Sequence, residues 1–363
     1  MTYRRLGWLV LAAVAATAHA APPTPPLQPR HSGPATPARA TAAAEPLPQE
    51  VTGAPASSGE ARPTVVATAA PARAPDPGDL RSLTDDPVVG KALRIEGEER
   101  KGLVAFTFDD GPNPETTPAV IAALEKYDVP ATFFIVTQRI VGRHGETSRE
   151  ILERELAGGF LVGSHSVTHP NLKHAAGDQL SREIDASIRT LAAAAHRPIG
   201  MFRPPYGALS PAGRVRLKKL GLTEVFWSVD TLDWKAHNAD RLRKKVVSMI
   251  KHDDGGVVLM HDVKPITAQV IAGVLDDLEA ENCARLAAGR DPIVPVSLHY
   301  FLRDGRDGRD GAHGRGDKPT PRAIPAAVAK RTEAYRAALP ERCARRPPPA
   351  EPAPEPAPRH AAK

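Results

Sequence analysis

The segment Leu103–Pro112, with the sequence LVAFTFDDGP, is the stretch from which the fold can be read. It opens with a mainly apolar run, and two carboxylates and a Gly-Pro turn follow directly. Continuous hydrophobicity of this kind is typical of a strand that is buried on both faces, as in a parallel sheet covered by helices. The segment therefore predicts a buried parallel strand that ends in acidic residues.

Further apolar runs follow this one, and helix-like stretches lie between them. The predicted strands are 103–108, 131–136, 160–163, 200–202, 225–229, 257–260 and 293–298. The predicted helices are 117–127, 149–157, 178–195, 211–220, 239–251 and 267–281. Seven strands that alternate with helices predict an α/β fold in the form of a barrel or barrel-like domain.

Composition sets this region apart from its flanks. The 363 residues include 38 prolines and 28 glycines, and the prolines concentrate in the two flanks. Residues 21–85 contain too few large apolar side chains to offset the entropy of ordering, so we expect a disordered Pro/Ala-rich linker there. Residues 86–302 are the expected folded domain. Residues 303–363 are expected to be a low-complexity charged and Pro-rich tail, with a short helix from Ala326 to Leu339.

The N-terminus predicts export. A basic segment at Tyr3–Arg5 precedes an apolar run, and Ala18-His19-Ala20 supplies a cleavage pattern, so residues 1–20 are typical of a signal peptide. An uncleaved anchor is the alternative. The apolar run is shorter than the ~20 residues of a membrane span, so no stable span is expected after cleavage. The expected location is the periplasm or the exterior, where the two cysteines, Cys283 and Cys343, are allowed to form a disulfide.

The charge pattern argues against a nucleic-acid partner. The chain has 48 basic and 42 acidic residues, a net charge of +6, and no long block of like charges. Aromatic residues make up 4% of the chain, and no basic stripe alternates with stacking aromatics. We therefore expect no nucleic-acid binding, and we expect a monomer.

Ionisable side chains follow five of the predicted strands. They are Asp109 and Asp110 after the first strand, His165 and His169 after the third, Arg203 after the fourth, Asp230 and Asp233 after the fifth, and His261 at the end of the sixth. The carboxyl ends of parallel strands meet on one face of an α/β domain, and chemistry is built there. The pattern therefore predicts an active site on that face.

The residue types indicate a metal site. His165 and His169 lie four residues apart, and Pro170 disfavours a helical conformation of His169. Two histidines with one carboxylate make a three-ligand site with open positions, which suits catalytic zinc or non-haem iron. The paired carboxylates Asp109 and Asp110 also require a compensating positive charge, so a metal ion, an arginine or both are expected.

Two further assignments depend on position. Arg203, beside a stiff Pro-Pro turn, is expected to pair with the carboxylate that does not bind the metal. His261 and His174 both follow a similar three-residue pattern, but only His261 ends a buried strand. We therefore choose His261 as the functional histidine.

Five ordered motifs, within roughly residues 100–300, resemble those of the polysaccharide deacetylase family, the carbohydrate esterases of family 4 with a NodB homology domain. They are Thr107–Pro112, His165–His169, Arg203–Gly207, Asp230–Trp234 and Leu259–His261. The resemblance implies a distorted (β/α) barrel and a divalent metal, usually Zn²⁺, with Co²⁺ as another option. It also implies removal of N-acetyl groups from an N-acetylglucosamine-containing polysaccharide, such as peptidoglycan or a chitin-like glycan, with release of acetate.

The same resemblance implies a role for each matched residue. The implied metal ligands are Asp110, His165 and His169. Asp109 would be the general base, oriented by Arg203, and His261 would be the general acid, oriented by Asp233. The backbone N–H of Tyr206 would bind the oxyanion, and the side chains of Tyr206 and Trp234 would line the substrate groove.

Three alternatives remain open from the sequence. An O-acetyl esterase would use the same scaffold on another substrate. A non-catalytic glycan-binding protein would not need the base and acid that the motifs retain. An iron-dependent oxygenase would use two histidines and a carboxylate, but it would need neither the second carboxylate nor the arginine.

Overall fold

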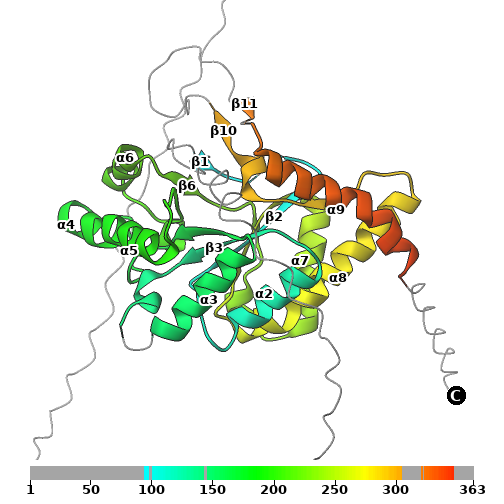
Figure 1. Cartoon of the computed structure of the whole chain (residues 1–363), viewed down its shortest axis with the longest axis horizontal. Coiled ribbons are helices and arrows are strands. Elements are labelled where there is room, and N and C mark those ends of the chain that lie inside the picture. Colours follow the sequence, from blue (N-terminus) through cyan, green and yellow to red (C-terminus); the bar gives the residue numbers. More distant parts are fainter. Residues whose placement is uncertain (1–93, 98–99, 143–144, 305–319, 322, 347–363) are drawn as a thin grey trace, which may run out of the picture. The chain divides into compact units, whose positions relative to one another are not determined.

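The computed structural model of the protein describes residues 94–97, 100–142, 145–304, 320–321 and 323–346 (Figure 1). The predicted signal peptide 1–20 and linker 21–85 lie outside these residues, as do the parts of the predicted tail at residues 305–319 and beyond residue 346. None of the helices in the described ranges combines the length and the apolar character needed to span a bilayer.

The described chain contains a nine-stranded parallel sheet. Its strands run in the order β1-β6-β5-β4-β3-β2-β8-β7, and β9 pairs with β2. The strands are β1 (Arg94–Ile95), β2 (Leu103–Asp109), β3 (Ala131–Ile135), β4 (Leu161–Ser164), β5 (Met201–Phe202), β6 (Thr223–Val225), β7 (Val229–Asp230), β8 (Gly255–His261) and β9 (Val294–Pro295). The sheet curls into a distorted (β/α) barrel, which confirms the predicted fold class.

Helices cover the sheet (Figure 1). They are α2 (Thr117–Lys126), α3 (Gly145–Ala157), α4 (Gly177–Leu180), α5 (Ala186–Ala195), α6 (Pro211–Leu220), α7 (Ala239–Asp253), α8 (Pro265–Ala287) and α9 (Ala326–Ala344). The short turns are η1 (Thr137–Ile140), η3 (Pro205–Gly207), η4 (Asp233–Lys235) and η5 (Leu298–Phe301). The single helix expected over 178–195 is instead α4 and α5 joined by a π-helical segment, η2 (Ser181–Asp185).

Strand β2 shows why the apolar runs are continuous. Val104, Phe106 and Phe108 belong to the cluster that packs against residues of α2 and α8. Leu103 and Ala105, which point to the opposite face, belong to a second cluster with Val257 of β8 and Val294 of β9. Because both faces of the strand are buried, no alternation with polar residues is found, as predicted for a parallel sheet.

The fifth predicted strand, 225–229, is wrong as a single element. Strand β6 ends at Val225 after pairing with β5 and β1, whereas β7 begins at Val229 and pairs with β8. Between them the carbonyls of Val225 and Phe226 accept hydrogen bonds from the Arg203 side chain, at 3.2 and 3.0 Å. The chain therefore stops pairing with β5 and begins to pair with β8 as it passes the buried Arg203 side chain. An apolar run in the sequence does not indicate such a change of partner strand.

The segment 303–363, for which composition predicts a tail, contains helix α9. It includes the predicted helix Ala326–Leu339 and continues to Ala344. Tyr335 and Leu339 are buried, and a disulfide joins Cys343 of α9 to Cys283 of α8. The predicted helix is therefore packed, because two buried apolar side chains and one disulfide hold it to α8 and the core, and the folded part of the chain extends past residue 302.

Candidate active site

Parallel pairing brings the residues of the five motifs to one end of the sheet. Asp109, the last residue of β2, is in register with His261, the last residue of β8. On the other side of β2, Ser164 of β4 is in register with Phe202 of β5. His165 and Arg203 directly follow these two residues, and so they leave the sheet at the same level.

Asp110, His165 and His169 form a cluster that is able to hold a metal ion. One ligand atom from each residue lies within 4.8 Å of the others. Asp110 Oδ1 lies 3.3 Å from His169 Nε2 and 3.7 Å from His165 Nε2. Among the residues that the structure describes, this Oδ1 is buried without a hydrogen-bond partner, which is costly unless a cation covers it. The donor set of one carboxylate and two imidazoles fits a divalent cation such as zinc.

The environment of His165 prepares it for a metal. Its Nδ1 lies 2.7 Å from the carbonyl oxygen of Arg203, so the ring donates a proton there and leaves Nε2 unprotonated. Burial lowers the pKa of His165 to about 3, so the imidazole is neutral at physiological pH. A neutral ring with a free Nε2 is the form in which histidine binds metals.

Two of the three cluster residues have an unusual backbone. Asp110 has φ +77° and His169 has φ +61°, in the left-handed region that residues other than glycine rarely adopt. As Pro170 predicts, His169 is not part of a regular helix. Its N–H donates to Ser166 Oγ at 2.9 Å, which helps to hold this conformation.

Asp109 is paired with a fully buried arginine. Arg203 donates from Nη1 to Asp109 Oδ1 at 2.7 Å and to Thr107 Oγ1 at 2.8 Å. The other oxygen of Asp109, Oδ2, lies 3.5 Å from His165 Nε2 and so faces the cluster. Burial raises the pKa of Asp109, and the positive charge of Arg203 opposes this rise. The result is a carboxylate with one oxygen held by an arginine and one directed toward the cluster.

His261 is paired with the buried carboxylate of Asp233. Its Nδ1 lies 2.7 Å from Asp233 Oδ1, and its backbone N–H donates to Oδ2 at 2.7 Å. Thr267 Oγ1 also donates to Oδ2, at 2.6 Å. Burial lowers the pKa of His261, but the hydrogen bond and the charge of Asp233 outweigh burial and raise the pKa to about 9. His261 therefore carries a proton at neutral pH, and its Nε2–H is left for another partner.

This pairing predicts a pH effect in the metal-free protein. We expect His261 to titrate near pH 9, and we expect Asp233→Asn to lower its pKa because the anionic partner is lost. The sign follows from linkage: the folded pKa lies above the unfolded value of about 6.5, so this stabilisation is complete below pH 6.5 and disappears as the pH rises through 9. NMR titration of the imidazole signals measures the pKa. A His261 pKa that Asp233→Asn leaves unchanged would contradict the pairing.

Two aromatic side chains lie exposed in the other matched motifs. Tyr206 is 67% exposed and Trp234 is 49% exposed. The ring of Tyr206 lies 4.7 Å from the ring of His169, so it stands beside the metal cluster. Asp230, the remaining acidic residue of the fourth motif, accepts the N–H of Leu232 at 3.0 Å and so supports the turn before Asp233.

Glu183 is a supporting residue that the sequence analysis does not identify. It lies in the π-helical segment η2, and its carboxylate accepts hydrogen bonds from Val167 N, Thr168 N and Thr168 Oγ1 at 3.1, 3.0 and 2.8 Å. All three donors lie in the loop between His165 and His169. Glutamate in a helix is ordinary in a sequence, so no local signal separates Glu183 from an exposed glutamate such as Glu153.

We expect Glu183→Gln to weaken zinc binding, because an amide replaces a carboxylate that holds the loop between two ligands. Partners that only support a metal ligand typically contribute about 10–100-fold to metal affinity. Competition with a chromophoric chelator measures this affinity, and Glu153→Gln, an exposed position on α3, is the matched control. Equal affinity in the two variants would rule out this supporting role.

Asp262, next to His261, is a second residue that the sequence analysis does not identify. It is fully buried and accepts a hydrogen bond from Thr117. Burial and the charge of Asp110 raise its pKa to about 7, while the hydrogen bond from Thr117 and the charge of Arg139 oppose the rise. A Cβ atom at Gly111 would lie 2.0 Å from Asp262 Oδ2. Residue 111 must therefore be a glycine for two reasons: it forms the Asp-Gly-Pro turn, and any side chain there would collide with the Asp262 carboxylate.

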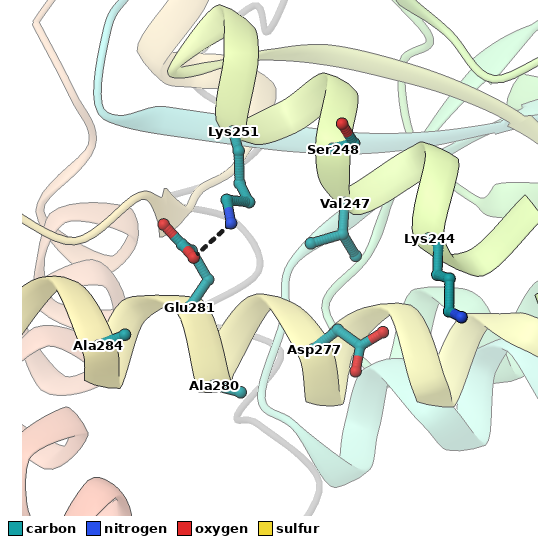
Figure 2. Close-up of a pocket in the computed structure, with 8 residues that line it drawn as sticks. All are labelled: Lys244, Val247, Ser248, Lys251, Asp277, Ala280, Glu281 and Ala284. Carbon is teal, nitrogen blue, oxygen red and sulfur yellow. Dashed lines mark ion pairs between the residues drawn. The ribbon is translucent and has the colours of Figure 1, made fainter. Parts of the chain in front are cut away.

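A separate hollow lies between α7 and α8 (Figure 2). It is lined by Lys244, Val247, Ser248, Lys251, Asp277, Ala280, Glu281 and Ala284. Lys251 and Glu281 form an ion pair at 2.7 Å, and Arg243 donates to Asp277 at 2.7 Å. Three of the four charged lining residues are held in ion pairs, and no histidine or cysteine lines the hollow, so we assign no chemistry to it.

Comparison with known proteins identifies the family. Residues 96–225 match the family described as polysaccharide deacetylase. A chitooligosaccharide deacetylase from Azorhizobium caulinodans is 34% identical over 179 residues, which cover 49% of this chain and 81% of that protein. The chain belongs to the polysaccharide deacetylase family. This result confirms the resemblance that the five motifs indicate.

Two more relatives show how far the likeness extends. A peptidoglycan-N-acetylglucosamine deacetylase from Listeria monocytogenes is 37% identical over 183 residues, 49% of this chain and 36% of that protein. The chain thus spans about a third of the length of that relative. The solved structure of a family 4 carbohydrate esterase from Streptomyces lividans has 31% identity and a TM-score of 0.44, and the match covers 50% of this chain and 89% of that chain.

Proposed function

We propose that the protein is a metal-dependent hydrolase that removes N-acetyl groups from an N-acetylglucosamine-containing polysaccharide and releases acetate. The observation that supports this most strongly is that two hydrogen-bonded pairs, Asp109–Arg203 and His261–Asp233, lie at the same end of the sheet as a three-residue cluster able to hold a metal. Two relatives are named for deacetylation of peptidoglycan N-acetylglucosamine and of chitooligosaccharides. Their names favour peptidoglycan or a chitin-like glycan as the substrate.

Asp110, His165 and His169 would hold the metal ion, and zinc suits this set of donors best. When bound, such a cation supplies a Lewis acid that polarises the acetamide carbonyl and makes a water molecule more acidic. The protein contributes the position of the ligands: His165 is fixed by the Arg203 carbonyl, and the loop carrying His169 is held by Glu183.

Asp109 would act as the general base and take a proton from the attacking water. Its Oδ2 faces the cluster while Arg203 holds Oδ1, so the free oxygen has a defined direction. A pKa raised by burial makes a carboxylate a stronger base, which helps proton transfer as long as the group stays ionised. The positive charge of Arg203 keeps Asp109 from becoming protonated, and its hydrogen bond fixes the rotamer of the Asp109 side chain.

His261 would act as the general acid for the departing sugar amine. Its pKa of about 9 keeps the ring protonated at neutral pH, and Asp233 holds Nδ1 so that Nε2–H is available to the leaving nitrogen. The backbone N–H of Tyr206 would stabilise the oxyanion of the tetrahedral intermediate, a contribution typically worth about 3 kcal/mol per donor. Tyr206 and Trp234 would line the groove for the sugar chain.

The setting of the reaction follows from the N-terminal sequence. The predicted signal peptide would export the chain to the periplasm or out of the cell, where a polysaccharide substrate is found. The Pro/Ala-rich segment 21–85 would act as a spacer before the catalytic domain, and we expect the enzyme to be a monomer.

The test is acetate release with zinc from a panel of peptidoglycan, chitooligosaccharides and acetylated xylan. We expect release from at least one of the two N-acetylated substrates and loss of activity when the metal is chelated. Release from acetylated xylan alone would instead identify an O-acetyl esterase. Binding to the glycans without any acetate release would indicate a glycan-binding protein.

A further inference from the structure

A cavity of about 460 Å³ lies directly beside the metal cluster. It is lined by Asp110, Val136, Gln138, Arg139, Thr168 and His169. Two of these residues belong to the metal cluster, and Gln138 and Arg139 belong to the η1 turn that follows β3. Whatever occupies this cavity therefore lies next to the reacting group of a bound substrate.

The η1 turn is tied to both loops that carry the metal-binding residues. Thr137 N donates to the carbonyl of Ser166 at 3.1 Å, and Gln138 N donates to the carbonyl of Val167 at 3.0 Å. Just before the turn, Val136 N donates to the carbonyl of Gly111 at 3.1 Å. The backbone that carries Arg139 thus has a fixed position relative to Asp110 and His169, and the Arg139 side chain lines the cavity from this turn.

The charge of Arg139 acts on the buried carboxyl of Asp262 at longer range, but no carboxylate is in direct contact with its guanidinium among the described residues. Across the described part of the chain, its guanidinium forms no ion pair and no side-chain hydrogen bond, and the residue is exposed. Arg203 also lies near the site, but its N–H groups already donate hydrogen bonds to Thr107, to Asp109 and to the backbone carbonyls of residues 225 and 226. Arg139 is therefore the cation in the cavity wall that remains available to a ligand.

The surrounding charges define which ligand needs this arginine. Outside the metal cluster, Arg139 is the charged residue in the lining of this cavity, so it attracts an anionic group of a ligand that enters there. Arginine binds a carboxylate through two parallel N–H donors, and a planar guanidinium suits this better than a lysine does. The hydroxyl and acetamide oxygens of a neutral sugar also accept hydrogen bonds, but they offer no negative charge to the guanidinium.

We propose that Arg139 forms a subsite for a carboxylate that the substrate carries next to the sugar undergoing deacetylation. This inference rests on the proposed function and narrows its substrate to acidic glycans. The carboxylate has two chemical sources: the lactyl ether of N-acetylmuramic acid in a peptidoglycan strand, or a uronic acid in an acidic polysaccharide. A neutral chitin chain offers neither.

Arg139→Gln tests the subsite, and Arg241→Gln, at an exposed position on α7, is the matched control. Three N-acetylated oligosaccharides of similar length serve as substrates: a peptide-free muramyl strand, a uronic-acid-containing chain and chitotetraose. We expect Arg139→Gln to raise KM by about tenfold on a carboxylated substrate, in line with loss of a charge-assisted hydrogen bond, and to leave chitotetraose unchanged. Added salt should reduce the wild-type preference for the carboxylated chain.

A second measurement separates this proposal from the proposed function. Binding of the same labelled oligosaccharides to the metal-free protein requires no turnover, so it still decides the subsite if no acetate is released. Tighter binding of a carboxylated chain than of chitotetraose, lost in Arg139→Gln and kept in Arg241→Gln, supports the subsite. The chain that shows the preference, muramyl or uronic, identifies the source of the carboxylate. Equal binding of charged and neutral chains, or equal effects of the two substitutions, would overturn the proposal.

Discussion

Asp109→Asn should abolish nearly all acetate release while the protein retains its metal. An amide cannot accept the proton of the attacking water, and a positioned general base typically contributes about 10²–10⁴-fold to the rate. The metal cluster consists of other residues, Asp110, His165 and His169, so the zinc content should stay near that of the wild type. Acetate assays and elemental analysis on the same preparation measure both quantities.

The substitution also tests the partnership with Arg203. Removing one charge of a buried ion pair typically costs about 3–5 kcal/mol of stability, although the amide oxygen retains an acceptor for Nη1. Thermal unfolding therefore needs to show that the variant is folded at the assay temperature. Asp291→Asn, at an exposed position, serves as the matched control. Turnover close to that of wild type in folded Asp109→Asn would refute the assignment of Asp109 as the base.

His165→Ala should remove the metal and, with it, the activity. The two remaining cluster residues, Asp110 and His169, would offer only one carboxylate and one imidazole. Substitution of residues that merely support a ligand costs about 10–100-fold in metal affinity, so loss of the ligand itself should cost at least about 100-fold. Elemental analysis after dialysis, and competition with a chelator, measure this effect.

His174→Ala is the control for this experiment, because His174 is an exposed histidine in the same region of the chain. We expect His174→Ala to keep the zinc content and the activity of the wild type. A His165→Ala protein that binds zinc as tightly as His174→Ala would show that the cluster is not the metal site. The metal requirement of the reaction would then have to be explained elsewhere in the chain.

The fold could be predicted from the sequence where burial leaves a continuous apolar signal. Strand β2 was predicted to within one residue, and α6 was predicted at its observed bounds because Pro211 marks its first turn. The predicted strand 225–229 is wrong, because Arg203 takes carbonyls that a strand would have used. Helix α9 was predicted over 326–339, but its packing was not, since Tyr335 and Leu339 are too few to change the average composition of the segment and yet are buried.

The sequence by itself determined the class of the domain and the chemical types at its functional end, because buried strands require apolar side chains and the polar residues directly after them stand out. The resemblance of the motifs implied the pairs Asp109–Arg203 and Asp233–His261, but the sequence could not show that Glu183 holds the loop between two histidines. That contact depends on hydrogen bonds between a side chain and the backbone of another segment, which no local pattern records. Only the tertiary structure gave the geometry of the pairs Asp109–Arg203 and Asp233–His261 and placed Arg139 beside the metal cluster, since parallel pairing brings the carboxyl ends of the strands, with the turns that follow them, to one side of the sheet.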